Sequence, residues 1–435
     1  MTYQNKFCIR YSIFCFLLSF FCFLPLIGFS QLLTLGECYE KTEKNYPLIQ
    51  QLELINLSEK YNLQNVTRAW IPQLQLYGKA TLQSDAPKFD LGKITEGMGF
   101  SIPMKVDVPK DQYQAYLQLN QIIWDGGQIR SAKQTIQAAS EVQRKQNAVE
   151  MYTLRGRVNE LFFGIILYDS QIEQINVNLK ELQRNLEKVM SYEELGFANE
   201  SDMDAVKVEQ LTAEQQIIQL TTMREAFVAM LGAFMGEELA PNIMLQKPDI
   251  VLIEEHNNRL ELQLFDASIA VQKIQNMQIL AHNMPKIGLF VQGGFARPGL
   301  NMFDTGGKLY AIGGVQLNWN FGNLYTLKNE KRIVETNINQ IEINRKLFLL
   351  NQTIQTKQQR AVAEQYKKIL TSDDEIIRMR ETIYRASEAK TENGTMSVTD
   401  LMRDFNMEHA AKAQKIVHEV QYLKALYDLK NLYNN

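Results

Sequence analysis

Residues 112–127 read QYQAYLQLNQIIWDGG, a stretch in which apolar and polar side chains alternate until the chain turns at two glycines. Alternation with a period of two predicts a β-strand that has one apolar and one polar face. Tyr113, Ala115, Leu117 and Leu119 would form the apolar face, and Gln114, Tyr116, Gln118 and Asn120 the polar one. The sequence therefore predicts a strand that lies between two different environments.

The segment after this turn predicts a very long helix. It contains neither proline nor glycine before Gly156, and from Leu154 to Val189 apolar residues recur at alternating spacings of four and three. This spacing is that of a coiled-coil seam. At 1.5 Å per residue, a helix from Gln128 to Leu195 would be ~100 Å long. One chain thus joins a two-faced strand to a helix far longer than a globular domain is wide.

The same order of elements is predicted twice along the chain. Residues 31–240 predict a helix over 33–69 interrupted near Pro47, a strand over 73–82, an exposed loop over 84–111, the strand from Gln112, the long helix, and a helix over 201–235. Residues 241–435 predict a helix over 251–281, strands over 286–295 and 308–320, a long helix over 324–393 and a final helix. A glycine ends each long helix and an aspartate follows six positions later, in the pairs Gly196–Asp202 and Gly394–Asp400. We therefore expect an internally duplicated chain.

The N-terminus has the pattern of a secretory signal peptide. Lys6 and Arg10 precede an apolar run from Ile13 to Phe29, and small residues occupy the −3 and −1 positions of a cleavage site after residue 30. We expect residues 1–30 to be a signal peptide, and a retained membrane anchor is the alternative. The mature chain then keeps one cysteine, Cys38, and can form no internal disulfide. The net charge of −3 offers no basic excess for binding nucleic acid.

The four predicted strands favour an outer-membrane β-barrel. Each is about ten residues long, which is roughly the length that a tilted strand needs to cross a bilayer. Each has one apolar face and one face rich in Gln and Asn, as expected for a barrel with a wet lumen. The aromatic residues at strand ends, where a girdle would lie, are Tyr113, Trp124, Phe295, Trp319 and Phe321. A soluble sheet packed on the helices is the alternative, but it would leave the glutamine-rich faces and the long helices unexplained.

Four strands cannot close a barrel, and an open edge in lipid leaves backbone groups unpaired at a cost of several kcal/mol each. Two chains would supply eight strands, whose side chains fill the interior, and three chains would supply twelve, enough for an aqueous pore. The polar inner faces favour three chains. We therefore predict a membrane α+β protein: a trimeric 12-stranded outer-membrane β-barrel, four strands per chain, continued by a long α-helical coiled-coil periplasmic tunnel.

Short motifs along the chain carry a resemblance to a known family. They are AWIPQL at 69–74, LQLNQ at 117–121 leading into IWDGG at 123–127, PKI at 285–287, and the two glycine-to-aspartate helix tips. On these motifs the chain resembles the TolC family of outer-membrane efflux proteins, over essentially the whole mature sequence. The resemblance implies a homotrimeric channel in outer-membrane lipid, with its helical part in the periplasm. It also implies two partners, a periplasmic adaptor (membrane fusion) protein and an inner-membrane pump of the RND or ABC type.

The resemblance also implies which residues act. The helix tips at Gly196 and Gly394 would dock the adaptor, and acidic residues on the helix after each tip would narrow the periplasmic entrance and favour cations. Asp400 stands at the family's acidic position, and Asp202 is its counterpart in the first half. A helix-capping role is an equally strong interpretation of Asp400, because Ser397 precedes it at capping-box spacing.

The chain departs from the family pattern around the second tip. The family's second gate acid corresponds to Arg403 here, and the adjacent Asp404 would face ~100° away on a helix. Thr391 stands where an aromatic residue is usual before the tip glycine, and Tyr192 is one position early in the first half. The sequence therefore does not assign the residues that would close the gate.

No catalytic or metal-binding constellation is found in the sequence, so we expect neither an enzyme nor a cofactor. The four histidines have no metal-ligand spacing, and we expect them on solvated faces. We predict an outer-membrane channel component of a tripartite efflux or type I secretion system, exporting small molecules or polypeptides. The alternative is a periplasmic coiled-coil adaptor, or a structural envelope protein, with a retained N-terminal anchor. The four membrane-length strands count against this alternative.

Overall fold

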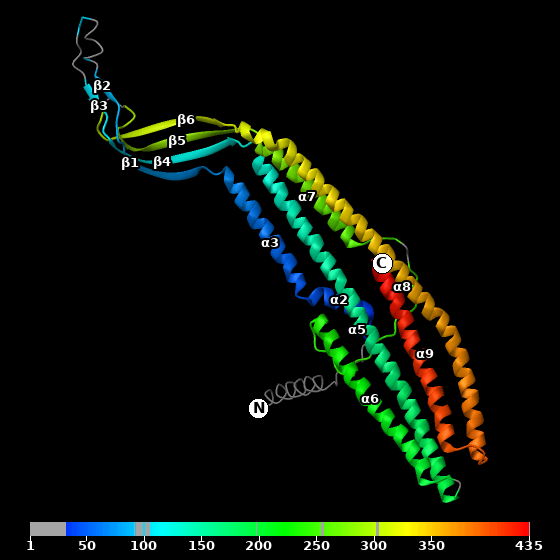
Figure 1. Ribbon diagram of the computed structural model, residues 1–435. Coiled ribbons are helices and arrows are strands. Elements are labelled where there is room, and N and C mark those ends of the chain that lie inside the picture. The colour runs from blue at the N-terminus through cyan, green and yellow to red at the C-terminus, as the bar shows by residue number, and fades with distance from the viewer. Residues whose placement is uncertain are drawn as a thin grey trace, which may run out of the picture. The chain divides into compact units, whose positions relative to one another are not determined.

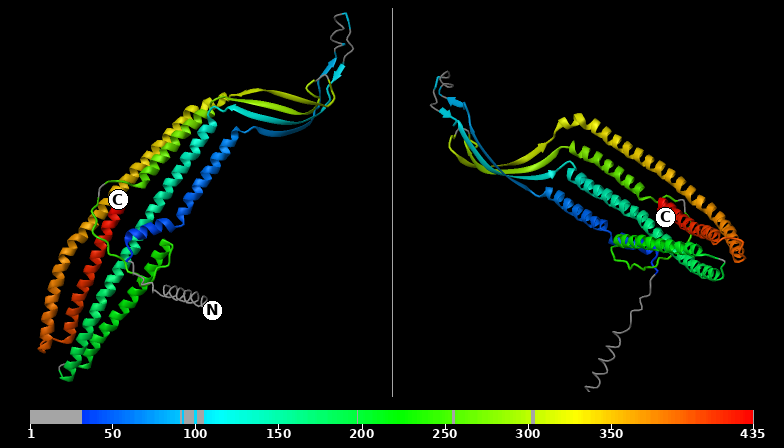
Figure 2. Two further views of the ribbon diagram at one scale, coloured as in Figure 1. Left: turned by 180° about the vertical axis from the view of Figure 1, so that it is seen from behind. Right: turned by 60° about the horizontal axis from the view of Figure 1, so that its bottom comes forward.

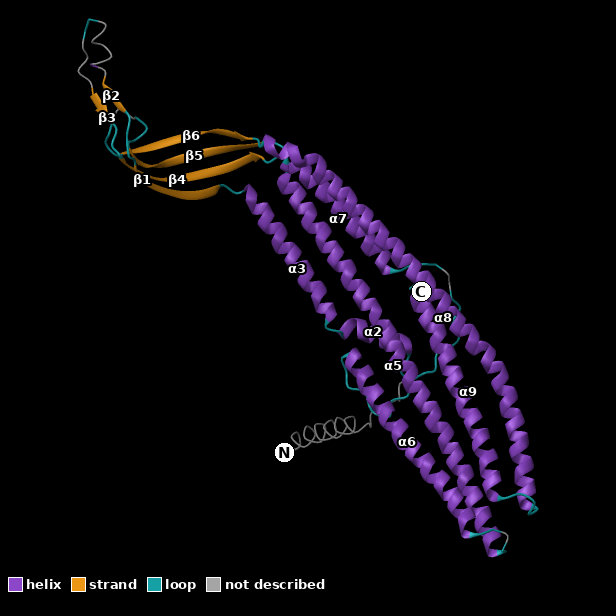
Figure 3. Cartoon of the chain, viewed as in Figure 1, coloured by secondary structure: helices purple, strands orange, loops and turns teal. Residues whose placement is uncertain are grey.

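The computed structural model describes residues 32–90, 92, 99–100, 105–196, 198–253, 256–301 and 304–434. The predicted signal peptide, residues 1–30, lies outside the described residues. In chain order the elements are α2 (Leu35–Asn45), α3 (Leu48–Thr67), η1 (Arg68–Trp70), β1 (Gln73–Leu82), β2 (Lys88–Asp90), β3 (Lys105–Asp107), β4 (Asp111–Trp124), α5 (Gln128–Glu194), α6 (Glu200–Met235), α7 (Leu260–His282), β5 (Lys286–Arg297), β6 (Lys308–Asn318), η3 (Phe321–Asn323), α8 (Leu324–Glu392) and α9 (Val398–Tyr433) (Figure 1). Figure 3 shows the division of the chain into long helices and a separate group of strands.

The chain divides into two compact units, and α5 and α8 run through both of them. One unit, here called the sheet unit, comprises residues 47–153, 254–358 and 432–435. The other, the tip unit, comprises the residues up to 46 together with 154–253 and 359–431. Each unit draws on both of the predicted repeats, 31–240 and 241–435, and the assignment of those repeats stays a prediction.

The sheet unit contains a four-stranded antiparallel sheet in the order β1-β4-β5-β6 (Figure 2). The central pair, β4 and β5, joins the two halves of the chain, with Gln118 opposite Gln292. The strands β1 and β6 each have one neighbour and form the edges of the sheet. A short antiparallel hairpin, β2 paired with β3, lies within the predicted loop over 84–111.

The predicted strands are confirmed, whereas one predicted helix boundary is wrong. The first helix, expected over 33–69 with an interruption near Pro47, forms as α2 and α3, and the backbone tightens into η1 before Pro72. The helix expected over 251–281 begins only at Leu260. Val251 and Ile253 instead pack as irregular chain against Ala363 and Leu426 in the tip unit, so burial outweighs their place in a helical pattern.

The tip unit has an apolar core between α2, α5, α6 and α9. Its largest fully buried side chains on α5 include Phe162, Phe163 and Ile165. Cys38 of α2 is fully buried in the same core. The start of α2 has a capping box, in which the side chains of Thr34 and Glu37 each accept a hydrogen bond from the other residue's backbone N–H group.

Helix α6 combines a capped start with an apolar surface. By length and composition α6 could cross a membrane, a test that a packed helix also passes. Asn199 and Asp202 form a reciprocal capping box at its start. Leu211 and Ile218 are 59% and 67% exposed, so α6 presents apolar side chains that the described part of the chain leaves uncovered.

Candidate functional site

The two faces of the four-stranded sheet differ in polarity and in exposure. The register places Gln75, Gln118 and Gln292 on one face, with burial alternating between half-buried and exposed along β4 and β5. The polar side chains of these two strands are the half-buried ones, as expected for a sheet that curves toward its polar face. The apolar face is convex and exposed, and its most exposed residues are Leu74, Leu76, Leu82, Leu309, Val315 and Leu317 at 65–84%.

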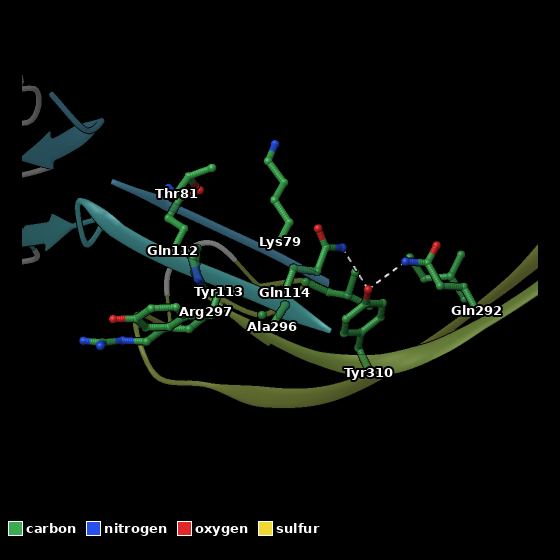
Figure 4. A pocket seen from close by; sticks show the side chains of 13 residues that line it. Lys79, Thr81, Gln112, Tyr113, Gln114, Gln292, Ala296, Arg297 and Tyr310 are labelled. Carbon is green, nitrogen blue, oxygen red and sulfur yellow. Dashed lines mark hydrogen bonds between the residues drawn. The ribbon is translucent and has the colours of Figure 1, made fainter. Parts of the chain in front are cut away.

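A hydrogen-bonded network covers the polar face. The amides of Gln114 and Gln292 both donate to the phenol oxygen of Tyr310, at 2.9 and 2.7 Å (Figure 4). The rings of Tyr77 and Tyr116 stack across β1 and β4 with centroids 5.0 Å apart. These bonds hold polar side chains in place on a concave surface, as a hydrated wall requires.

Aromatic side chains lie at both ends of the sheet, as the sequence predicts. Tyr113 and Phe295 are 46% and 44% exposed where the strands meet the loops. At the ends next to the helices, Trp124 and Trp319 are 42% and 44% exposed. The indole N–H of Trp319 donates to the backbone oxygen of Asn283 at 3.1 Å, which fixes its ring beside Phe321. Amphipathic rings in these positions suit the two borders of a membrane.

Each long helix in the tip unit ends at a glycine with left-handed backbone. Gly196 has φ 75° and Gly394 has φ 68°. At the second tip the N–H groups of Gly394 and Thr395 donate to the oxygens of Thr391 and Lys390, which is the Schellman arrangement. An added Cβ would meet nothing within 4 Å at either glycine, so the backbone conformation alone selects glycine here.

Both predicted gate aspartates take part in helix capping. The carboxylate of Asp202 accepts the backbone N–H of Asn199 at 3.0 Å. The carboxylate of Asp400 accepts the hydroxyl of Ser397 at 2.7 Å, while the N–H of Asp400 donates back to that hydroxyl. Capping therefore accounts for both positions, and a gate role remains a hypothesis.

Arg403 and Asp404 do different things although they are adjacent. The guanidinium of Arg403 lies 2.9 Å from Asp400, whose charge it offsets. The carboxylate of Asp404 is 12% exposed and accepts the hydroxyl of Ser387 on α8 at 2.6 Å. Asp404 thus links α8 to α9, a role that its sequence position did not predict.

A cleft of about 730 Å³ lies between the two tips. Its lining residues are Tyr192, Leu195, Asn199 and Asp202 from the first tip and residues 391–398 from the second. Thr391 is buried there and its hydroxyl donates to the oxygen of Ser387. The cleft brings both predicted docking tips, at Gly196 and Gly394, into one surface region.

The expectation that all histidines lie on solvated faces is wrong for His409. This side chain is buried between α5 and α9, where its Nε2 lies 2.9 Å from a carboxylate oxygen of Glu181. Burial lowers the pKa of His409, although the Glu181 carboxylate acts in the opposite direction. Among the described residues, no group of three or more His, Cys, Asp or Glu side chains is arranged to hold a metal ion.

Comparison with known proteins identifies the fold. No family model matches the chain, and no curated protein matches it. Solved structures do match. The match to the outer-membrane channel OprN has a TM-score of 0.64 and 12% identity, and it covers 92% of this chain and 90% of the OprN chain. The CmeC outer membrane channel of Campylobacter jejuni has a TM-score of 0.62 and 11% identity, over 92% of this chain and 85% of that one. The MtrE outer membrane channel of Neisseria gonorrhoeae has a TM-score of 0.63 and 12% identity, over 92% and 89%.

The chain therefore has the fold of TolC-like outer-membrane channels, as the resemblance in its motifs implies. The match extends over more than nine tenths of the chain, so it includes both the sheet unit and the tip unit.

Proposed function

We propose that this protein is an outer-membrane channel of a tripartite efflux or type I secretion system. In this role it resides in the cell outer membrane, with its helical part in the periplasm, and it is a passive duct rather than an enzyme. Its exported cargo would be small molecules or polypeptides.

The observation that carries the proposal is the two-sided sheet. A convex face with leucines up to 84% exposed would be costly in water but suits lipid. A concave face of bonded glutamines and tyrosines suits an aqueous lumen. A soluble sheet packed on helices would bury one of these faces, and both lie open in the chain.

The two free edges of the sheet support assembly. Unpaired backbone groups of β1 and β6 would be exposed to lipid in a single chain. Three chains, each adding four strands edge to edge, would close a 12-stranded barrel wide enough for a pore. The exposed apolar side chains of α6 would then pack against the neighbouring chain, continuing the barrel as a coiled-coil tunnel. Duplication of a half-molecule would account for the repeated order of elements.

The tip cleft supports the proposed partners. Docking of a periplasmic adaptor at Gly196 and Gly394 would pull the two tips apart and open the entrance, and an inner-membrane pump of the RND or ABC type would supply the energy. Asp202, Asp400, Arg403 and Asp404 would surround this entrance, with capping and charge both contributing to its closed form.

Surface labelling tests the topology. In a Lys88→Cys variant, the new thiol in the exposed hairpin strand β2 should react with an impermeant maleimide on intact cells. The native Cys38 need not be removed, because burial raises the pKa of its thiol to about 12 and keeps it protonated. A Glu193→Cys variant near the first tip should react only after the outer membrane is opened.

Labelling of both variants on intact cells would contradict the assignment of the tips to the periplasm. If neither reacts until the outer membrane is opened, the result would favour a periplasmic adaptor or a structural envelope protein. The mass of the detergent-solubilised particle tests the trimer separately, since three chains are expected in each particle.

A further inference from the structure

The charges on the polar face of the sheet are all of one sign. Along the four strands, the described side chains on this face include lysines and no aspartate or glutamate. The lysines are Lys79 on β1, Lys286 on β5 and Lys308 on β6. Asp111 and Arg297, which pair at 2.9 Å, lie on the opposite face. The concave wall is therefore basic.

Two of these lysines are not neutralised. Asp304 in the loop between β5 and β6 forms an ion pair with Lys308. Lys79 and Lys286 form no ion pair within the part of the chain that the structure describes. Lys79 is exposed and lies opposite Gln114 in the strand register, near the loop end of the sheet.

A cavity of about 370 Å³ lies beside Lys79 on this face. Lys79, Thr81, Gln112 and Tyr310 contribute to its lining (Figure 4), as does the segment from Arg297 to Leu300. The cavity combines an ammonium group with hydroxyl and amide donors, which are the groups that bind anionic oxygens.

Tyr310 adds a directed donor to this cavity. Its phenol oxygen has two lone pairs, and the amides of Gln114 and Gln292 occupy both of them. The hydroxyl proton is therefore left to donate to a third group. Figure 4 shows the phenol oxygen between the two amides, on the side of the sheet from which Lys79 projects.

We infer that this cavity is a transit site for organic anions, with Lys79 attracting a carboxylate and the Tyr310 hydroxyl donating to it. The inference rests on the proposed channel function, because the concave face becomes the lumen only in a closed barrel. In a trimer, three copies of Lys79 would form a basic ring near the outer end of the lumen. Such a ring favours passage of anions.

The two aspartates predicted at the tips each have a local partner. Asp400 is offset by Arg403 at 2.9 Å, and Asp202 is bound to the backbone of its own helix start. On the polar face of the described strands, the charges without an ion-pair partner are those of Lys79 and Lys286. Anionic cargo would meet attraction at the outer end of its path.

Conductance measurements test the inference. The purified wild-type protein is inserted into a planar bilayer, and citrate or an equal concentration of uncharged erythritol is added to each side in turn. Citrate should reduce the current in a concentration-dependent way, and erythritol should not. In the Lys79→Gln variant the half-blocking concentration of citrate should rise about fivefold, as expected for loss of one exposed ion pair. In Tyr310→Phe it should rise about twofold to threefold.

The control variant Lys88→Gln removes the same charge from the exposed hairpin and should leave the block unchanged. Equal block in wild type and Lys79→Gln, or equal weakening by Lys88→Gln, would overturn the inference while leaving the channel itself established. A wild-type protein that carries no current would contradict the proposed function first, and the anion site with it. Gel filtration of each variant checks that the particle assembles. Lys79→Gln should assemble as wild type does, because Lys79 is exposed and its replacement disturbs no packing.

Discussion

The imidazole of His409 on α9 lies 2.9 Å from the carboxylate of Glu181 on α5, inside the packed tip unit. The second ring nitrogen of His409 faces the amide of Gln174 at 3.4 Å, and its ring lies 4.3 Å from that of Phe405. Glu408 and Lys412, paired at 2.6 Å, lie on the same helix. A titratable group is thus part of the contact between two helices that lead to the tips.

The first prediction concerns the pH dependence of stability. The pKa of folded His409 is lowered mainly by burial, so the unfolded chain, with an ordinary pKa of ~6.5, binds more protons as the pH falls. Above pH ~6.5 the titration of His409 therefore does not lower the free energy of unfolding. As the pH falls through and below that value, it destabilises the folded tip unit. The melting temperature should fall by a few degrees between pH 7.5 and pH 5.5, at roughly 2–4 °C per kcal/mol.

The variant His409→Gln separates this effect from general acid sensitivity. Glutamine can still donate to Glu181 but does not titrate in this range. Its melting temperature should change less between the two pH values than that of the wild type. A wild-type pH dependence that survives unchanged in His409→Gln would assign the effect to other groups.

The second prediction concerns the centre of the sheet. A Cβ at Gly294 would lie 2.2 Å from the backbone oxygen of Ala115 and 2.4 Å from the Cβ of Tyr116, both on β4. Gly294→Ala should therefore force β4 and β5 apart and cost about 1–3 kcal/mol or more. The expected result is a smaller fraction of assembled protein in the outer membrane, measured by fractionation and gel filtration.

The neighbouring glycine is a matched control for this effect. A Cβ at Gly293 would meet no heavy atom closer than the oxygen of Tyr310, at 3.8 Å. Gly293→Ala should leave assembly unchanged because its methyl group points to the other face of the sheet. Equal loss in both variants would mean that close packing of β4 on β5 is not the cause.

The third prediction concerns the helix tips. Gly394 has φ 68° and open space around its Cα, so Gly394→Ala should be destabilising by backbone strain alone, at about 1 kcal/mol. Gly36 in α2 also has open space but no left-handed backbone, so Gly36→Ala should stabilise slightly. Thermal unfolding of the two variants beside wild type measures the difference, and a shift of the same sign in both would refute the argument.

The sequence predicts the elements of this fold well because their signals are local. Alternation in 112–127 and the seam from Leu154 to Val189 each depend on short-range periodicity, and β4 and α5 form where these patterns predict them. The boundary at Leu260 was mispredicted because Val251 and Ile253 are held by residues far along the chain.

Sequence patterns also miss partners that are distant in the chain. His409 and Glu181 are 228 positions apart, and Tyr310 and Gln114 are 196 apart. No periodicity relates these positions, because the pairing of β4 with β5 and of α5 with α9 decides which side chains meet. The alternation of polar residues did predict that Gln114 lies on the polar face of its strand, because that signal is local.

The last prediction separates the two interpretations of Asp400. As a cap, the Asp400 carboxylate accepts a hydrogen bond from the Ser397 hydroxyl. As a gate, it would present a negative charge to the entrance, and the guanidinium of Arg403 at 2.9 Å offsets that charge. Asp400→Asn removes the charge and keeps an oxygen for the cap, so a gate role predicts lower cation preference with little loss of stability. Arg403→Gln should act in the opposite direction, because it leaves the carboxylate of Asp400 uncompensated. Reversal potentials across a salt gradient measure the ion preference of both variants. If neither variant's reversal potential differs from that of wild type, the only function of Asp400 is to cap α9.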